Sequence, residues 1–161
     1  MRRSAPLLVL VVGLLGSLDA SAESFRQGGK FGLGLGGGFG VSGLSGKYFV
    51  TKSQAFQAMV GGDGVLDGDG GGGLGVGLDY LIEGPALART EPLDIAWSIG
   101  AGGTLGVGDA VGIGASGVAG LEFCINPVPI DLVLEFRPGI VIVPEVGADI
   151  VNFSGHVRWY F

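Results

Sequence analysis

The sequence predicts an all-β protein, specifically an eight-stranded antiparallel transmembrane β-barrel. Apolar and polar residues alternate with a period of two in many segments, which is typical of strands with one apolar and one polar face. The mean hydropathy is +0.56, yet after the first 22 residues no apolar run is long enough for a membrane helix. The 35 glycines also disfavour helices, because glycine costs about 1 kcal/mol relative to alanine inside one.

The first 22 residues have the pattern of a cleaved secretory signal peptide. Two arginines follow Met1, an apolar run covers residues 7–18, and Ala20-Ser21-Ala22 provides the small residues of a cleavage site. The apolar run is shorter than the roughly 20 residues that a membrane anchor needs. We therefore expect cleavage after Ala22 and one domain over residues 23–161.

The first four predicted strands cover residues 30–40, 43–52, 55–63 and 74–83. In the second and third strands Tyr48 and Phe56 share a face with smaller apolar residues, and in the fourth Tyr80 does so. Residues 64–73 are too rich in glycine and aspartate to pair, so they predict a long loop. The first strand has a purely glycine and lysine face opposite the apolar residues Phe31, Leu33, Leu35 and Phe39.

The last four predicted strands cover residues 93–105, 111–125, 130–143 and 149–161. The strand around Trp97 has the clearest alternation, and the two prolines of residues 126–129 predict a tight turn after the next strand. Pro138 cannot donate to a strand ladder and therefore predicts a bulge or an unpaired position. The even number of strands, each near the ~9 to 11 residues needed to cross a bilayer, suits the smallest barrels.

The aromatic residues support a membrane topology with both termini in the periplasm. Most of them fall toward the periplasmic ends of their strands and predict one interfacial girdle, with Phe39 and Phe153 at the opposite end. The predicted girdle consists of Phe31, Tyr48, Phe56, Tyr80, Trp97, Phe123, Trp159 and Phe161.

The last strand ends on an alternating apolar and aromatic series. Val157, Trp159 and Phe161 lie on one face, and this ending resembles the C-terminal signal of bacterial outer-membrane β-barrel proteins. The glycine of that signal is displaced, because Gly155 stands one place before His156. The resemblance implies recognition of Val157, Trp159 and Phe161 by the barrel-assembly machinery.

Four segments, PLDIAWSIGAGGTLG, VGIGASGVAGLEF, PIDLVLEFRPGIVIVPE and GHVRWYF, together resemble an uncharacterised family of short outer-membrane β-barrel proteins. The better-known small barrels of the OmpA and OmpX type share the architecture only. The resemblance implies an eight-stranded fold in the outer membrane of a Gram-negative-type bacterium, in contact with its lipid. It implies no activity and transfers no functional residues.

Alternation places a set of charged residues inside the barrel, where charges removed from water must pair. A structural salt-bridge network is one interpretation, and a selectivity filter is the other. The outer half of the same face is mostly glycine, which predicts either a water-filled vestibule or relief of crowding in a curved wall. The predicted interior charge network is Lys30, Lys47, Asp79, Glu83, Asp94, Glu122, Asp131, Glu135, Arg137 and Arg158.

Three other patterns carry weaker signals. Gly32, Gly34 and Gly37 fit a dinucleotide fingerprint, but the helix that this fingerprint requires is not predicted after them. Ser154, His156 and Glu135 could form a Ser-His-acid set, although residues two apart on a strand lie ~6.5 Å from one another, too far for a direct hydrogen bond. The loop 64–73 with Asp63, Asp67 and Asp69 is interpreted as solvated, with calcium binding left open.

The predicted function is that of a small integral outer-membrane protein with a structural, surface-interaction or minor-channel role. No catalytic residue, cofactor or metal site is expected, and the net charge of −6 offers no basic patch for nucleic acid. The sequence does not indicate an external ligand. The alternative is a secreted soluble glycine-rich β-domain or adhesin, and a lipid-processing barrel enzyme is a weaker one.

Overall fold

The computed structural model describes residues 29–63 and 73–161, which form strands and no helix. The predicted signal peptide, Asp67 and Asp69 lie outside the described residues. The strands are β1 (Phe31–Gly38), β2 (Val41–Phe49), β3 (Gln54–Asp63), β4 (Gly73–Glu83), β5 (Ala88–Arg89), β6 (Leu93–Val107), β7 (Val111–Ile125), β8 (Ile130–Phe136), β9 (Gly139–Val143), β10 (Gly147–Asp149) and β11 (Phe153–Tyr160).

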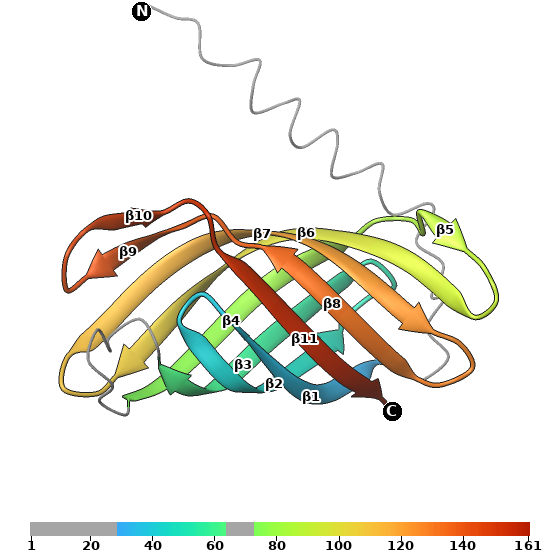
Figure 1. The fold of residues 1–161 in the computed structure, drawn as a ribbon, viewed down its shortest axis with the longest axis horizontal. Coiled ribbons are helices and arrows are strands. Elements are labelled where there is room, and N and C mark those ends of the chain that lie inside the picture. Colours follow the sequence, from blue (N-terminus) through green and yellow to red (C-terminus); the bar gives the residue numbers. More distant parts are fainter. Residues whose placement is uncertain (1–28, 64–72) are drawn as a thin grey trace, which may run out of the picture.

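Eight of these strands form a closed antiparallel barrel (Figure 1). The ring runs β1, β2, β3, β4, β6, β7, β8 and β11, and pairing of β11 with β1 closes it. Closure comes from register pairs such as Leu33 with Trp159, and from the Phe161 amide, which donates to the Phe31 carbonyl oxygen at 2.8 Å. The predicted eight-stranded antiparallel barrel is therefore confirmed.

The predicted strand 130–143 is divided at Pro138, as its missing N–H group predicts. β8 and β9 both pair with β7, and the Gly117 amide donates to the Pro138 carbonyl oxygen at 2.9 Å across the break. On the other side β8 pairs with β11 while β9 pairs with the short β10. The last predicted strand is consequently also divided, since residues 150–152 lie between β10 and β11.

The wall of the barrel is longer on one side than on the other. The terminal end carries Phe161 and the 126–129 turn, and the far end carries the β1–β2, β6–β7 and β9–β10 connections (Figure 1). β6 and β7 have 15 residues each, whereas β1 has 8 and β2 has 9. The barrel wall is therefore much longer on the β6–β7 side than on the β1–β2 side.

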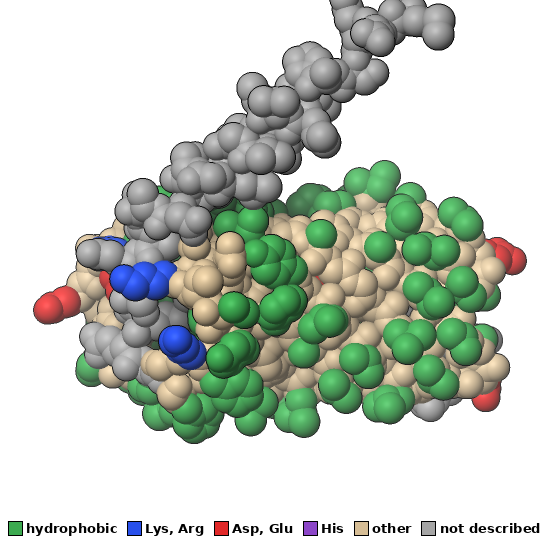
Figure 2. All heavy atoms as spheres, turned by 180° about the vertical axis from the view of Figure 1, so that it is seen from behind, with side chains coloured by type: hydrophobic (Ala, Val, Ile, Leu, Met, Phe, Trp, Pro, Cys, Tyr) green, Lys and Arg blue, Asp and Glu red, His purple; other side chains and the backbone are tan. Residues whose placement is uncertain are grey.

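The outer surface of the barrel is apolar. Figure 2 shows hydrophobic side chains along the whole visible length of the barrel, with charged side chains only near its two ends. Exposed residues from every strand of the ring contribute, including Leu35 at 65%, Leu44 at 59% and Leu78 at 57%. Cross-strand register also joins four aromatic residues of the predicted girdle in one row, Phe31, Tyr48, Phe56 and Tyr80.

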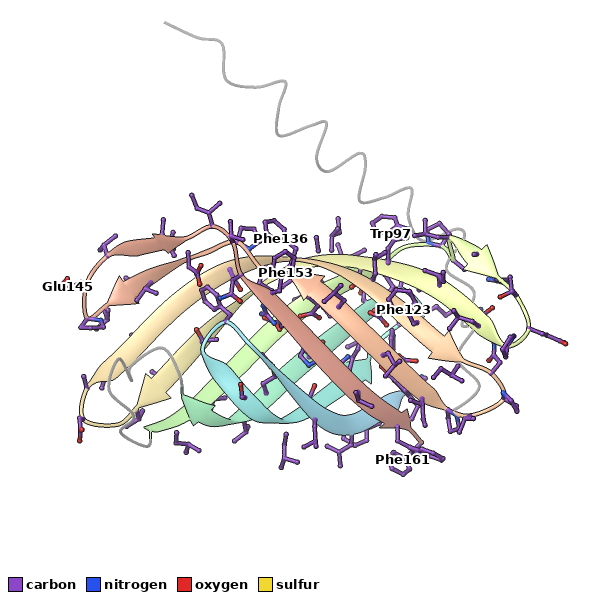
Figure 3. All side chains as sticks on the ribbon, in the orientation of Figure 1. Trp97, Phe123, Phe136, Glu145, Phe153 and Phe161 are labelled. Carbon is purple, nitrogen blue, oxygen red and sulfur yellow. The ribbon has the colours of Figure 1, made fainter. Side chains whose placement is uncertain are left out.

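The sequence places Phe39 and Phe153 on the outer face at the end opposite the girdle, and only Phe153 lies on that face. Phe153 packs against Phe136, with ring centroids 5.5 Å apart, near the middle of the barrel (Figure 3). Phe39 is only 3% exposed and lies inside the barrel. The prediction of an outward Phe39 is wrong because the residue belongs to the β1–β2 turn, with φ of 46°, where strand alternation no longer sets the side-chain direction.

Candidate functional site: the interior charge network

The candidate site is the polar interior of the barrel. Nine of the ten predicted interior charges are buried, and they extend from six different strands or their ends. Lys30 is the exception: it precedes β1, lies exposed, and stands outside the interior. The buried residues are Lys47, Asp79, Glu83, Asp94, Glu122, Asp131, Glu135, Arg137 and Arg158.

The lysine cluster lies toward the terminal end and consists of Lys47, Glu83 and Glu122. The Lys47 ammonium forms ion pairs with the carboxylates of Glu83 and Glu122, and all three side chains are at most 2% exposed. Because these residues come from β2, β4 and β7, the cluster joins three separate parts of the wall across the interior. Each buried charge of this cluster therefore has an oppositely charged partner within ion-pair distance, which lowers the cost of its burial.

The glutamate cluster lies closer to the middle of the barrel and is centred on Glu135. Its carboxylate accepts hydrogen bonds from Ser154 Oγ at 2.7 Å, Gln57 Nε2 at 2.9 Å and Arg137 Nη1 at 3.1 Å. Arg137 also binds Asp79, with 2.5 Å between Nη2 and Oδ1. Gln57 therefore stands beside two carboxylates, because its Nε2 also donates to Asp79 Oδ2 at 3.0 Å.

Arg158 has a different environment from the other two buried cations. Its Nε donates to Ser45 Oγ at 2.9 Å and its Nη2 donates to Gln57 Oε1, so both partners are neutral. Its Nη1 has no hydrogen-bond partner among the described residues. Arg158 thus connects β11 to β2 and β3. Among residues 29–63 and 73–161 it has no carboxylate within salt-bridge distance.

The predicted Ser-His-acid set is rearranged. Ser154 donates to Glu135 rather than contacting His156, and the serine beside the histidine is Ser45, with 3.0 Å between Ser45 Oγ and His156 Nδ1. His156 Nε2 lies 3.2 Å from Glu135 Oε2, which completes a serine, histidine and carboxylate series. However, Ser45 and Glu135 are 0% exposed and His156 is 3% exposed. A substrate has no access to this series, so the geometry favours a structural role.

The sequence did not single out Ser45 or Gln57, although both are central to these contacts. Gln57 follows Phe56 and so has inward parity in its strand, but alternation could not indicate which inward residues meet across the barrel. The sequence did contain one signal for such contacts. Ser45 is a polar residue two positions before Lys47, so both side chains have the same inward parity.

Aromatic rings cover the interior toward both ends. At the terminal end Phe49 and Tyr160 are buried, with ring centroids 6.2 Å apart. At the far end Phe39 lies inside the wall, and its amide donates to Asn152 Oδ1 at 3.0 Å. The charge clusters therefore lie between two aromatic covers.

The inward glycines of the wall leave room for neighbouring side chains. A Cβ on Gly102 would come within 1.9 Å of Asp79 Oδ1, and one on Gly36 within 2.1 Å of His156 Nδ1. A Cβ on Gly139 would come within 2.4 Å of the Phe39 ring. Beside Gly36, Gly102 and Gly139 the interior is therefore filled by side chains. At these positions the structure favours glycine as relief of crowding in the curved wall over a water-filled vestibule.

The dinucleotide fingerprint lacks the structural context that it requires. Gly32, Gly34 and Gly37 all lie in β1, which leads directly into the turn before β2 and not into a helix. Residues 29–63 and 73–161 contain no group of three His, Cys, Asp or Glu residues that could hold a metal ion. In the same residues no helix is long and apolar enough to cross a membrane.

Comparison of the chain with protein-family models, with curated proteins and with solved structures gave no match.

Proposed function

We propose that the protein is an integral β-barrel of a bacterial outer membrane with a closed, structural interior. The observation that carries the proposal is the inverted distribution of residues across the wall. Charged side chains are buried inside the closed barrel, while large apolar side chains cover its outside. In water this arrangement exposes a large apolar area, whereas in a bilayer the same area faces hydrocarbon.

Closure of the strand ring supports the same proposal. A bilayer offers no water to unpaired backbone groups, so a sheet within it must close on itself. The ring does so through β1 and β11. The alternative, a secreted soluble β-domain or adhesin, would need a polar outer face, and the middle of the barrel in Figure 2 lacks charged side chains.

Cell fractionation with heat-modifiable gel mobility tests the membrane location. We expect the protein to sediment with outer membranes, and its unheated form to migrate differently from its heated form because the closed barrel resists detergent. Recovery as a fully soluble periplasmic or secreted protein would overturn the proposal.

The terminal aromatic residue offers a second test, directed at assembly. Phe161 is 67% exposed and Phe153, on the same outward face, is 59% exposed. Because both rings project outward, Phe161→Ala and Phe153→Ala should affect the packed interior similarly little. If the assembly machinery reads the C-terminus, Phe161→Ala should reduce the amount of folded barrel in cells far more. Equal reductions would contradict recognition of Phe161.

The interior contacts favour a barrel that does not conduct. The lysine and glutamate clusters join opposite parts of the wall between aromatic covers, so no continuous water path is expected. Purified wild-type barrels in planar bilayers should give no steady current steps. Large, steady channels would instead support the minor-channel role.

A further inference from the structure

The outer surface contains a groove of about 510 Å³ beside the strand break at Pro138. It runs across β6, β7, β9 and β10, and its lining combines alanine, glycine, proline and isoleucine with a single serine. That serine, Ser116, is buried and turned toward Arg137 in the interior, with 3.4 Å between Ser116 Oγ and Arg137 Nη2. The side chains on the open side of the groove are therefore all apolar.

The groove exists because small and large outward residues meet at the break. Its floor is formed by Ala101 on β6, which pairs with Gly117 on β7, and by Ala115, which pairs with Ile140. Ile140 and Ile150 stand at the side of the floor and are 48% and 67% exposed. Elsewhere on the outer face, β6 and β7 carry larger side chains such as Trp97 and Leu121.

The back of the groove is closed by the interior. Gly139 lines the groove, and the space where its side chain would lie is occupied from inside by the Phe39 ring. Phe39 also lies against Gly114, where a Cβ would come within 2.9 Å of the ring. An occupant of the groove thus rests against a filled barrel and does not reach the charge clusters.

The position of the groove relative to the membrane follows from the proposed function, on which this inference rests. Ala101 lies four residues beyond Trp97 of the predicted girdle, or about 13 Å along the strand. β6 continues for six residues beyond Ala101, ending at Val107 with an exposed apolar side chain. The groove consequently lies between two apolar levels of the wall, at the depth of lipid chains.

These observations identify the occupant by its chemistry. An apolar groove left empty in hydrocarbon loses dispersion contacts on one side, so a flexible hydrocarbon chain is favoured to fill it. A polar headgroup would find no hydrogen-bonding side chain on the open side. A second barrel would need roughly 20 to 30 residues on each side of a stable interface, and ten residues line the groove. We infer that the groove binds one acyl chain of a bilayer phospholipid.

Photo-cross-linking tests this site with the whole folded barrel. The barrel is reconstituted in phosphatidylethanolamine vesicles that contain a small fraction of phospholipid with a diazirine in the acyl chain. After irradiation, mass spectrometry of peptides locates the lipid adducts. Adducts should concentrate on the groove residues of β6, β7, β9 and β10. Even labelling around the outer face would overturn the inference, and this map requires no variant.

A matched pair of substitutions sharpens the test. Ala115→Phe places a ring on the groove floor, whereas Ala58→Phe places the same ring on the outer face of β3, outside the groove. Ala115→Phe should lose most of the adducts on β7, β9 and β10, and Ala58→Phe should keep them. Heat-modifiable mobility establishes that both variants fold. Unchanged groove labelling in Ala115→Phe would overturn the acyl-chain site.

The controls separate this inference from the proposed function. Flotation with the vesicles reports insertion, and a barrel that does not float would overturn both the membrane location and the site. A barrel that inserts but labels evenly would overturn the site alone. Barrel-to-barrel cross-links that Ala115→Phe abolishes would assign the groove to a second copy and would also overturn the site.

Discussion

Leu134 and Glu135 are neighbours on β8, yet they meet opposite surroundings. Leu134 points outward and is 53% exposed, whereas Glu135 is fully buried and accepts hydrogen bonds from Gln57 on β3, from Ser154 on β11 and from Arg137 just after β8. The difference arises from the period of two in a strand, which sends successive side chains to opposite sides of the wall. A single layer of backbone therefore separates a polar, densely bonded interior from an apolar exterior.

This comparison means that the two faces should respond to substitution by different rules. Inside, the stability of each charge depends on named partners, because removal of one leaves the others buried and unpaired. Outside, stability depends on the match between the side chain and the surrounding medium, with few specific partners. Substitutions at the neighbouring positions Leu134 and Glu135 can therefore test the outer and the inner face separately at one place in the barrel.

The largest expected effect is that of Glu135→Leu. The change leaves Arg137, Ser154 and Gln57 without their shared acceptor in the interior. Breaking such a buried pair costs about 3–5 kcal/mol, so the free energy of unfolding should fall by that order. Urea titration of the folded barrel in vesicles, followed by tryptophan fluorescence, measures the loss.

Leu134→Ala is the matched control for this change. Its side chain projects outward, so truncation opens no interior cavity, and we expect a much smaller loss of stability. Comparable losses for the two variants would mean that the interior clusters contribute no more than surface contacts.

A second prediction reverses the test by placing a charge outside. Leu134→Arg should cost about 2–4 kcal/mol if the position faces the bilayer midplane, and Val107→Arg, at the end of β6, should cost about 0–1 kcal/mol. Urea titration in vesicles compares the two variants. A small effect of Leu134→Arg would contradict the membrane location, because a water-facing position tolerates arginine.

The sequence predicted the two faces well because alternation is a local property. The positions of Lys47, Glu122 and Arg158 on the inward side required only their parity within a strand. The break at Pro138 was equally local, since it follows from the missing N–H group of proline. Lys30 was misplaced because it precedes the first residue of β1, and strand ends are not fixed by alternation.

The contacts across the barrel could not be predicted in the same way. The choice of Ser45 over Ser154 as the neighbour of His156 depends on how β2 and β11 face each other through β1. The inward turn of Phe39 depends on a backbone conformation with positive φ, which bulky residues rarely adopt. The groove at Ala115 requires four strands in register, so no single segment indicates it.

The smallest predicted effect concerns the glycines of the wall and decides what fills the interior. Gly102 and Gly103 are neighbours on β6, with Gly102 on the inward face and Gly103 on the outward face. A Cβ on Gly102 would come within 1.9 Å of Asp79 Oδ1 and 2.5 Å of the Leu78 carbonyl oxygen. Asp79 cannot move away freely, because Arg137 and Gln57 hold its carboxylate. For Gly103 the nearest atom is the Gly114 carbonyl oxygen at 3.2 Å.

Gly102→Ala should therefore lower the free energy of unfolding by about 1–3 kcal/mol, the usual cost of forcing extra atoms into a packed interior. Gly103→Ala should change it by less than about 1 kcal/mol, since reduced freedom of the unfolded chain offsets a small shift of the neighbouring strand. The same urea titration in vesicles measures both values. If Gly102→Ala unfolds at the wild-type urea concentration, the space beside Asp79 is open, and the wall glycines line a water-filled vestibule instead of relieving crowding.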